Sequence, residues 1–345
     1  MEQKKILVTG GLGFIGSHTV VCLHEAGYTP VIVDNLHNSR IDVLSAIAQL
    51  IGFIPEFIHG DVNDKSLMTE IFAIHNPDAV IHFAAHKAVG ESVDQPLMYY
   101  NNNVVGLVSL LEVMKQADCK KLVFSSSCTV YGEPEQVPVK ESTPTRPAAS
   151  PYGATKQMGE VILKDNKWFE VQCLRYFNPV GAHESSLIGE LPLGVPNNLI
   201  PYLTQTVAGI RPQLTVHGGD YNTPDGTCIR DYIHVMDLAD AHVAAIGRLF
   251  SNPVEHKIEM GDPSLGNFEV FNIGTGHGYS VLEVISAFES ATGEKVPHII
   301  GPRRNGDVVA VWAETTKVNE VLGWKASRNL ETMMRDAWNW QKATS

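Results

Sequence analysis

The sequence predicts an α/β fold, a Rossmann-type doubly wound parallel sheet with a smaller mixed α/β substrate-binding lobe. In the first half of the chain, short apolar runs alternate with longer amphipathic ones, which is the pattern of βαβ units. The first apolar run leads directly into a glycine-rich loop, and the alternation stops near residue 178. We therefore place a Rossmann domain at 1–178 and a second lobe at 179–345, with some interchange of segments between them.

Six apolar runs in the first half are typical of buried strands. They do not alternate polar with apolar residues, as expected of parallel strands that are covered on both faces. The predicted strands are 5–9, 29–34, 54–59, 79–83, 121–125 and 171–176. Amphipathic patterns between them predict helices near 14–26, 39–51, 64–75, 97–117 and 153–168.

The second half begins with a segment rich in proline and glycine, from Pro179 to Pro196. Such a composition predicts a long structured loop. Helical patterns follow at 198–209, 235–250, 280–292 and 330–342, with short strands between them. We expect this half to close over the carboxyl ends of the parallel strands, where ligands bind in open α/β sheets.

Composition excludes several classes of function. The formal net charge of −12 over 345 residues argues against a nucleic-acid-binding protein. No apolar run is long enough to cross a membrane, and the start of the chain lacks the pattern of a signal peptide. The five cysteines are scattered and form no CxxC pair, which suits a reduced, cytoplasmic protein. The histidines show no metal-binding spacing such as HExxH, so no metal site is expected.

The glycine-rich loop predicts a dinucleotide site. Its three glycines lie between the first strand and the first helix, at Gly10, Gly13 and Gly16. Glycines at such positions allow a tight turn, a close approach of the main chain to a pyrophosphate, and close packing of helix on strand. The second strand ends in Asp34, and a carboxylate there binds a ribose 2′-hydroxyl, which favours NAD over NADP. We expect Asp61 and Val62 to lie beside the adenine.

A tyrosine and a lysine four residues apart form the second motif, at Tyr152 and Lys156. On a helix this spacing places both side chains on one face. A nearby ammonium stabilises a phenolate, so we expect Lys156 to lower the pKa of Tyr152 from its reference value of about 10. Tyr152 would then act as a proton acceptor for a sugar hydroxyl. A hydroxyl from the serine-rich strand end at 125–127 would complete the group.

These motifs and others along the whole chain resemble the extended short-chain dehydrogenases/reductases, and within them the UDP-glucose 4-epimerases. The further matching segments are VIHFAAHKAVGESV (80–93), YYNNNV (99–104), FSSSCTVYG (124–132), SPYGATK (150–156), LRYFNPVGAH (174–183), PNNL (196–199), DGTCIRDYIHVMDLA (225–239) and PRRNGD (302–307).

The resemblance implies a role for each matching position. The catalytic group would be Ser127, Tyr152 and Lys156, with Tyr152 as the acid/base. Tightly bound NAD would be contacted by Gly10, Gly13, Phe14, Ile15, Gly16, Asp34, Asn35, Asn38, Ser39, Asp61, Val62, Phe83, Ala84, Lys87, Asn102, Tyr152, Lys156, Tyr176 and Phe177. The UDP-sugar would be contacted by Ser127, Asn178, Asn198, Leu199, His217, Arg230, Tyr232, Arg304, Asp307 and Val311.

The implied reaction is NAD-dependent inversion of C4 of UDP-galactose and UDP-glucose through a 4-keto intermediate. Residues 1–178 would bind NAD and residues 179–345 the UDP-sugar. Relatives pair as homodimers through two helices, which would be 97–117 and 153–168 here. The position of Val311 lies beside the sugar pocket in the family, and a small residue there implies that UDP-GalNAc and UDP-GlcNAc are also substrates.

Three positions depart from the family pattern: Cys128 replaces an alanine, His217 replaces an aromatic residue, and His86 replaces a small or apolar one. Three alternatives to a hexose epimerase also follow from the sequence. A 4,6-dehydratase needs carboxylates beside the strand-end hydroxyl, whereas Cys128 and Thr129 follow Ser127 here. A 4-epimerase of UDP-glucuronate or UDP-pentoses is the nearer alternative. A non-catalytic NAD-sensing protein on the same fold would be expected to lack the Tyr–Lys pair.

Overall fold

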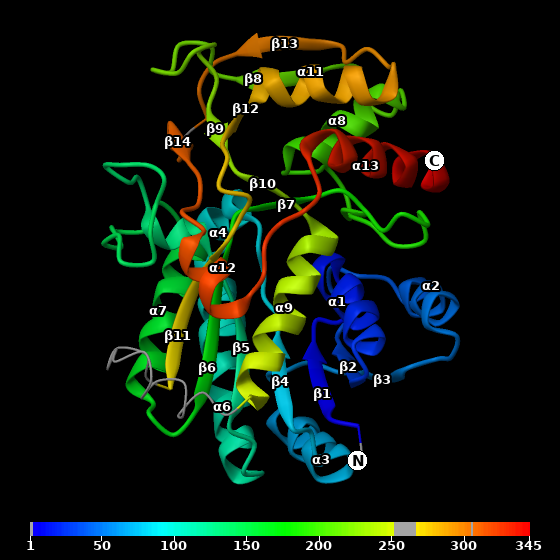
Figure 1. Cartoon of the computed structure of the whole chain (residues 1–345), viewed down its shortest axis with the longest axis vertical. Coiled ribbons are helices and arrows are strands. Elements are labelled where there is room, and N and C mark those ends of the chain that lie inside the picture. Colours follow the sequence, from blue (N-terminus) through cyan, green and yellow to red (C-terminus); the bar gives the residue numbers. More distant parts are fainter. Residues whose placement is uncertain (1–2, 252–266, 305) are drawn as a thin grey trace.

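A single parallel sheet organises the protein, and the predicted fold class is confirmed (Figure 1). The computed structural model describes residues 3–251, 267–304 and 306–345. The strand order is β11-β6-β5-β4-β1-β2-β3, and every neighbouring pair is parallel. The strands are β1 (Lys5–Thr9), β2 (Thr29–Asp34), β3 (Glu56–His59), β4 (Ala79–His82), β5 (Lys121–Ser127), β6 (Glu170–Tyr176) and β11 (Phe268–Ile273).

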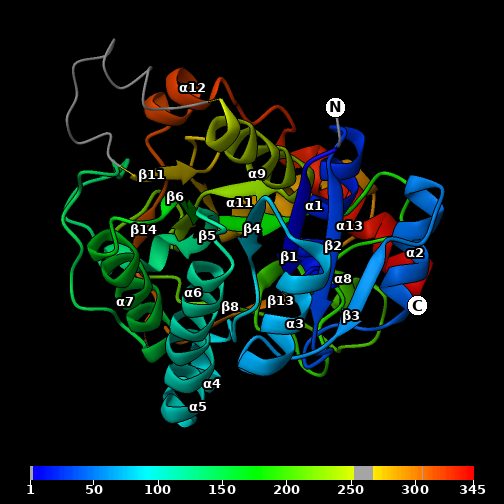
Figure 2. The same ribbon diagram turned by 90° about the horizontal axis from the view of Figure 1, so that it is seen from below.

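Helices cover both faces of the sheet, which is why its central strands β1, β2 and β4 are mainly apolar and buried. Ile6 and Val8 of β1 point to one face, into a core shared with α1 (Phe14–Glu25) and α9 (Val235–Phe250). Leu7 points to the other face, into a second core. The helices of that second core are α3 (Lys65–His75), α6 (Gly106–Gln116) and α7 (Pro151–Asp165). Figure 2 shows the sheet between these two helical layers.

The predicted helix at 97–117 is divided in the structure. It consists of α5 (Pro96–Tyr100), a wider π-helical turn η1 (Asn101–Val105) and then α6, with the short α4 (Val89–Asp94) before it. Three asparagines occupy the wide turn, and such turns are common at functional sites. The remaining helix of this half, α2 (Asp42–Ile51), begins three residues later than predicted.

The second half builds a lobe above the carboxyl ends of the strands (Figure 1). Its small sheets pair β7 (Asn178–Val180) with β10 (Tyr232–His234), β8 (Leu214–His217) with β13 (His298–Gly301), and β9 (Ile229–Arg230) with β12 (Tyr279–Ser280) and β14 (Ala310–Val311). Its helices are α8 (Leu199–Val207), α11 (Val281–Thr292), α12 (Thr316–Leu322) and α13 (Leu330–Thr344). However, α9 and β11 belong to the second half of the sequence and pack in the first domain. Among the described residues, no helix has both the length and the apolar character needed to cross a membrane.

Candidate active site

The glycine loop has the geometry of a pyrophosphate cradle. Gly10 has φ +70°, and a β-carbon there would lie 2.8 Å from the main-chain nitrogen of Ala84. A β-carbon on Gly16 would lie 2.3 Å from the carbonyl oxygen of Gly10, so neither position accepts a side chain. Helix α1 begins after Gly13 with no side-chain cap, which leaves its first N–H groups and its positive dipole end for an anion. The loop therefore fits the diphosphate of a dinucleotide.

The carboxylate of Asp34 links this loop to the end of β2. Its Oδ2 accepts from the Leu12 amide at 3.0 Å, and its Oδ1 accepts from the Leu36 amide at 2.9 Å and the Ser39 hydroxyl at 2.8 Å. Nearby, the side-chain amide of Asn35 donates to the Asp61 carboxylate at 2.9 Å. Burial alone would raise the pKa of Asp61, but hydrogen bonds from Asn63 and Asn35 lower it overall. The predicted adenosine-ribose residues thus gather at one edge of the sheet.

The other predicted dinucleotide residues surround the same edge. Phe14 and Ile15 form the first turn of α1, Asn38 lies in the turn after β2, and Val62 is buried after β3. Phe83 and Ala84 follow β4, where the Phe83 amide donates to the Thr9 carbonyl at 3.0 Å. In the wide turn of η1, Asn102 accepts from the Asn63 side chain at 3.3 Å.

The catalytic candidates meet at the ends of β5 and α7. Ser127 ends β5, and its hydroxyl oxygen accepts from the Thr129 amide at 3.2 Å and from the Thr129 hydroxyl at 3.0 Å. Tyr152 lies in the first turn of α7, which Ser150 caps by accepting from the Gly153 amide at 3.2 Å. The Lys156 ammonium, one turn later, donates to the Ser125 carbonyl at 2.6 Å.

Burial governs the electrostatics of this group. It raises the pKa of Tyr152 to about 12, against the lowering effect of a hydrogen bond with the Ser127 hydroxyl. It also lowers the pKa of Lys156 to about 8, against the raising effect of the Glu160 carboxylate. The expectation of a lowered Tyr152 pKa is therefore wrong, because desolvation of the phenolate dominates.

A buried ion pair that the sequence did not reveal lies behind the catalytic group. Glu160, one turn after Lys156 on α7, accepts from the Ser126 hydroxyl at 2.6 Å. The same carboxylate binds the Arg175 guanidinium through two contacts, at 2.9 and 2.6 Å. Ser126 precedes Ser127 and Arg175 precedes Tyr176, so the pair fixes both strand ends relative to α7. The signal available in the sequence was the charge four residues after Lys156.

The two aromatic residues after Arg175 face different surroundings. Tyr176 donates its hydroxyl proton to Nε2 of His242, because Nδ1 of that histidine donates to the Leu238 carbonyl at 2.8 Å. Burial lowers the pKa of His242 to about 4, so the imidazole is neutral. Phe177 instead belongs to a small apolar cluster that also contains Val311. The predicted nicotinamide side and the predicted sugar side of the site therefore share this cluster.

Two guanidinium groups meet a single carboxylate in the predicted UDP region. Arg304 binds Asp307 through two contacts, at 3.1 and 2.9 Å. Arg230 lies 3.6 Å from the same carboxylate, and its main chain pairs with Val311 between β9 and β14. Arg230 also lies close enough to the catalytic strand end to affect Cys128. Burial raises the pKa of Cys128 to about 11, and Arg230 lowers it in part. Two guanidinium groups therefore lie together in this region, and guanidinium groups are suited to binding phosphates.

Asp231 organises the strand ends on which Arg230 stands. It is fully buried, and its carboxylate accepts from the Thr275 hydroxyl at 2.6 Å and from the amides of Thr275, Gly276 and Ala313 at 2.8, 3.1 and 3.1 Å. Sequence reasoning missed this residue, because its partners lie 44 to 82 residues away.

Glu190 joins two residues that were predicted to contact different ligands. Its Oε1 accepts from the Lys87 ammonium at 3.2 Å and from the Asn198 amide at 2.8 Å. Trp340 holds the Glu190 main chain by donating to its carbonyl at 2.9 Å. Lys87 follows β4 and Asn198 precedes α8, so Glu190 bridges the Rossmann domain and the lobe.

The remaining predicted substrate residues are less closely gathered. Asn178 lies on β7, and its amide donates to the Asp231 carbonyl at 2.9 Å. Tyr232 is buried in the core of the lobe, and Leu199 packs against that core. His217 is exposed at the end of β8, opposite Gly301 of β13.

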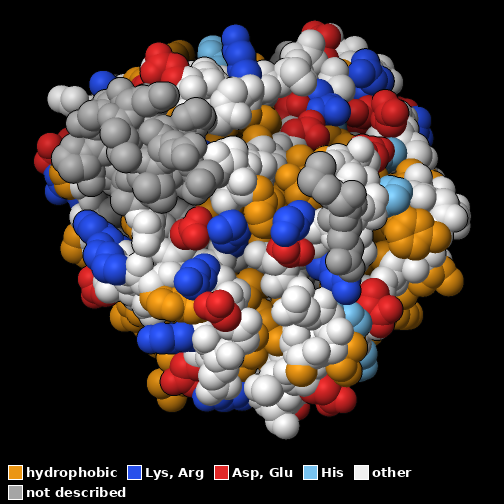
Figure 3. All heavy atoms as spheres, turned by 60° about the horizontal axis from the view of Figure 1, so that its bottom comes forward, with side chains coloured by type: hydrophobic (Ala, Val, Ile, Leu, Met, Phe, Trp, Pro, Cys, Tyr) orange, Lys and Arg blue, Asp and Glu red, His pale blue; other side chains and the backbone are white. Residues whose placement is uncertain are grey.

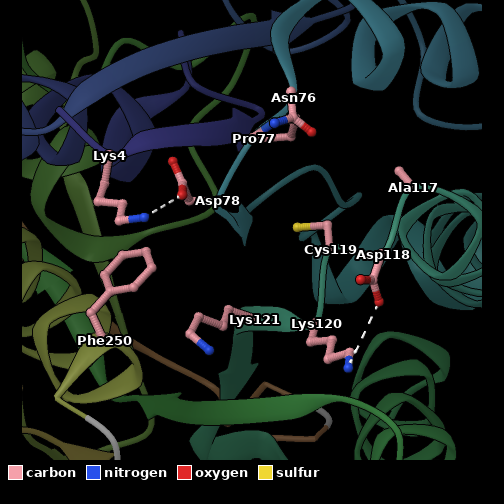
Figure 4. A pocket seen from close by; sticks show the side chains of 10 residues that line it. All are labelled: Lys4, Asn76, Pro77, Asp78, Ala117, Asp118, Cys119, Lys120, Lys121 and Phe250. Atoms are coloured by element: carbon pink, nitrogen blue, oxygen red, sulfur yellow. Dashed lines mark hydrogen bonds and ion pairs between the residues drawn. The ribbon is translucent and has the colours of Figure 1, made fainter. Parts of the chain in front are cut away.

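A separate hollow lies at the opposite edge of the sheet, beside the amino ends of β1, β4 and β5 (Figure 4). Its charges are paired, since Lys4 binds Asp78 at 2.7 Å and Lys120 lies 3.7 Å from Asp118. Basic and acidic side chains are also interspersed over the coloured surface in Figure 3. The hollow therefore presents no concentrated charge for a ligand. Among the described residues, no cluster of histidine, cysteine and acidic side chains could hold a metal.

This chain has relatives that match it in sequence and in fold. The sequence profile of the family described as GDP-mannose 4,6 dehydratase matches residues 7–337. A UDP-glucose 4-epimerase of Yersinia pestis is 52% identical over 340 residues, which cover 97% of each protein. A solved UDP-glucose 4-epimerase of Stenotrophomonas maltophila, with bound NAD and formylated UDP-arabinopyranose, is 45% identical, with a TM-score of 0.93 over 99% of both chains. One from Bifidobacterium longum, in complex with NAD+ and UDP, is 46% identical, with a TM-score of 0.90 over 99% of this chain and 98% of that chain.

Proposed function

This chain belongs to the UDP-glucose 4-epimerases of the extended short-chain dehydrogenase/reductase family, and we propose that it interconverts UDP-galactose and UDP-glucose with a tightly held NAD. One observation carries the proposal. The chain combines a glycine loop that fits a dinucleotide, the Ser127, Tyr152 and Lys156 group at the end of β5 and the start of α7, and the guanidinium pair of Arg230 and Arg304.

The chain's own residues handle the proton at the sugar O4. Bound NAD would supply the hydride chemistry at C4, with a 4-keto sugar between the removal of the hydride and its return. Tyr152 accepts the 4-hydroxyl proton and later gives it back, while the Ser127 hydroxyl orients the same oxygen. Lys156, whose nitrogen lies 5.8 Å from the centre of the Tyr152 ring, supplies the positive charge that the phenolate needs in a buried site.

The UDP moiety would be held more firmly than the sugar. Arg230 and Arg304 offer two forks of donors to the diphosphate, and Asp307 keeps the two guanidinium groups side by side. The sugar, in contrast, would face the apolar cluster of Phe177 and Val311. Few directional contacts there would allow the keto sugar to present its other face, as inversion requires.

The pocket would also accept a 2-acetamido group. Val311 is small, and its main chain pairs with that of Arg230, one of the two arginines proposed to bind the diphosphate. UDP-GalNAc and UDP-GlcNAc are therefore proposed as further substrates.

The protein would act as a homodimer in the cytoplasm. Valines and a methionine on adjacent helical surfaces stay exposed: Val105 and Val108 on η1 and α6, and Met158 and Val161 on α7. Apolar rows at i and i+3 on two neighbouring helices suit a helical bundle with a second copy. Light scattering should give twice the chain mass, and a chain with both V108E and V161E should give the monomer mass. A monomeric unmodified protein would contradict the dimer. All five cysteines are free, which fits a reducing compartment.

The direct test is conversion of UDP-galactose by the purified protein with no NAD added, followed by chromatographic separation of the products. Conversion to UDP-glucose supports the proposal and shows that the cofactor is retained. No conversion, even with NAD supplied to folded protein, would overturn it. UDP-glucuronate and UDP-pentoses would then be the substrates to assay.

A further inference from the structure

Two imidazole rings meet across the carboxyl edge of the sheet. The ring centres of His37 and His86 are 4.6 Å apart, and the ring planes cross at 62°. His37 lies three residues after β2, and His86 lies four residues after β4. Strand β1 stands between β2 and β4 in the sheet. The contact therefore spans the strand that leads into the glycine loop.

Proposed cofactor residues surround both rings. His37 lies between Asn35 and Asn38, and its amide donates to the Asn35 side chain at 3.0 Å. His86 precedes Lys87, and the carboxylate of Asp61 is close enough to raise its pKa in part. In a doubly wound sheet the dinucleotide crosses the strand edge between the strands on either side of the first one. A bridge between the loops after β2 and β4 crosses that same path.

The two rings differ in how firmly they are held. The main chain of His86 is fixed, because its amide donates to the Asn103 side chain at 2.9 Å and its carbonyl accepts from the same side chain at 3.0 Å. The Asn103 amide also donates to Thr155 of α7 at 3.1 Å. The His86 ring further contacts Tyr99, with the centres 5.5 Å apart. His37, in contrast, is exposed on its turn, so it is the part that can move aside.

We propose that His37 and His86 form a clasp over the dinucleotide, in which the ring contact closes the loops around the bound cofactor and slows its release. This inference rests on the proposed NAD site. Burial and the neighbouring His37 lower the pKa of His86, which disfavours a positive charge on that ring. An imidazole also keeps an N–H group that can donate to a phosphate oxygen in either protonation state.

The test measures cofactor exchange and does not depend on sugar turnover. Holoprotein is mixed with excess isotope-labelled NAD, and mass spectrometry follows the replacement of the bound NAD. The variants are H37A, H86L and the double variant. The matched control is H24A, because His24 makes a similar edge contact with Phe53, at 5.0 Å and 68°, at the other end of α1.

An aromatic pair contributes about 0.5–1.5 kcal/mol, so each single variant should exchange NAD about two- to tenfold faster than the unmodified protein. The double variant should be no faster than the faster single variant, since either change removes the same contact. Unchanged exchange in H37A and H86L, equal acceleration in H24A, or acceleration that multiplies in the double variant would each overturn the clasp.

UDP-galactose turnover, assayed in parallel, separates this inference from the proposed function. If NAD is bound and its exchange depends on the two histidines, but UDP-galactose is not epimerised, the reaction is rejected and the clasp stands. If UDP-galactose is epimerised and the exchange does not depend on the two histidines, only the clasp is rejected. Because His37 is exposed, H37A should fold and give an answer even if H86L does not.

Discussion

The ammonium of Lys156 donates a hydrogen bond to the main-chain carbonyl of Ser125, at 2.6 Å. This contact fixes the lysine to β5, the strand whose last residue is Ser127. The hydrogen bond thereby fixes Lys156 relative to Ser127. The third member of the catalytic group, Tyr152, stands one turn earlier on the same helix as Lys156. Mutation of Tyr152 should therefore leave Ser127 and Lys156 in place.

Y152F removes the proton acceptor and keeps the ring. General acid–base catalysis contributes about 10²- to 10⁴-fold, so kcat for UDP-galactose should fall within that range while bound NAD is retained. Y28F is the control, because Tyr28 stacks on Phe250, a residue that lines the hollow at the opposite edge of the sheet. A Y152F enzyme with more than a tenth of the original rate would assign the proton transfer to another group.

Lys156 should set the alkaline limit of activity. Burial lowers its pKa to about 8, so the ammonium is present below that pH and is lost as the pH rises through it. In the unmodified protein kcat should therefore decline above about pH 8. K156M should be slower at every pH, and its residual rate should lack that decline. If kcat of K156M still declines above the same pH, a group other than Lys156 sets the alkaline limit.

Lys156 should make stability depend on pH in the direction opposite to activity. The folded pKa is depressed to about 8 from the ordinary lysine value of 10.5, so the unfolded chain binds more protons between these values. Stability from this group alone should therefore rise with pH across that window. Unfolding of K156M by denaturant at pH 8 and pH 10 should show a smaller gain with pH than unfolding of the unmodified protein.

Glu190 should affect substrate binding more than turnover. Its carboxylate holds Lys87 and Asn198 together, and hydrogen bonds with charged groups contribute about 1.5–3 kcal/mol. E190Q should raise KM for UDP-galactose about tenfold or more, with a much smaller change in kcat. E184Q is the control, because Glu184 is exposed on the same loop. An equal fall of kcat with KM unchanged would mean that Glu190 acts on the chemical step.

The parts of the site that were predictable from sequence lie within continuous motifs. The glycine loop, Asp34 and the Tyr152–Lys156 pair each depend on local spacing that the fold preserves. Glu190 was not predictable, because its partner Lys87 lies 103 residues away and the loop that carries it has no periodic pattern. The direction in which the pKa of Tyr152 is shifted was also missed, because burial depends on the tertiary structure and cannot be inferred from residue spacing.

V311Y tests the proposed width of the sugar pocket. Val311 is buried beside Phe177 in the small apolar cluster, and its main chain pairs with Arg230. A tyrosine there adds a ring next to the proposed diphosphate site, and a bulky group in an apolar pocket changes discrimination by about 1–3 kcal/mol. Turnover of UDP-GalNAc should fall about 10- to 200-fold relative to UDP-galactose.

The control for V311Y is V308A, a change at a partly buried member of the same cluster. Both substrates should be assayed with the unmodified protein, V311Y and V308A, and the ratio of kcat/KM values compared. Because the ratio cancels losses of folded protein, a general packing defect would lower both rates and leave it unchanged. An unmodified protein that turns over UDP-galactose alone would show that neighbouring side chains already fill the space beside Val311, and the acetamido proposal would be discarded while the reaction stands.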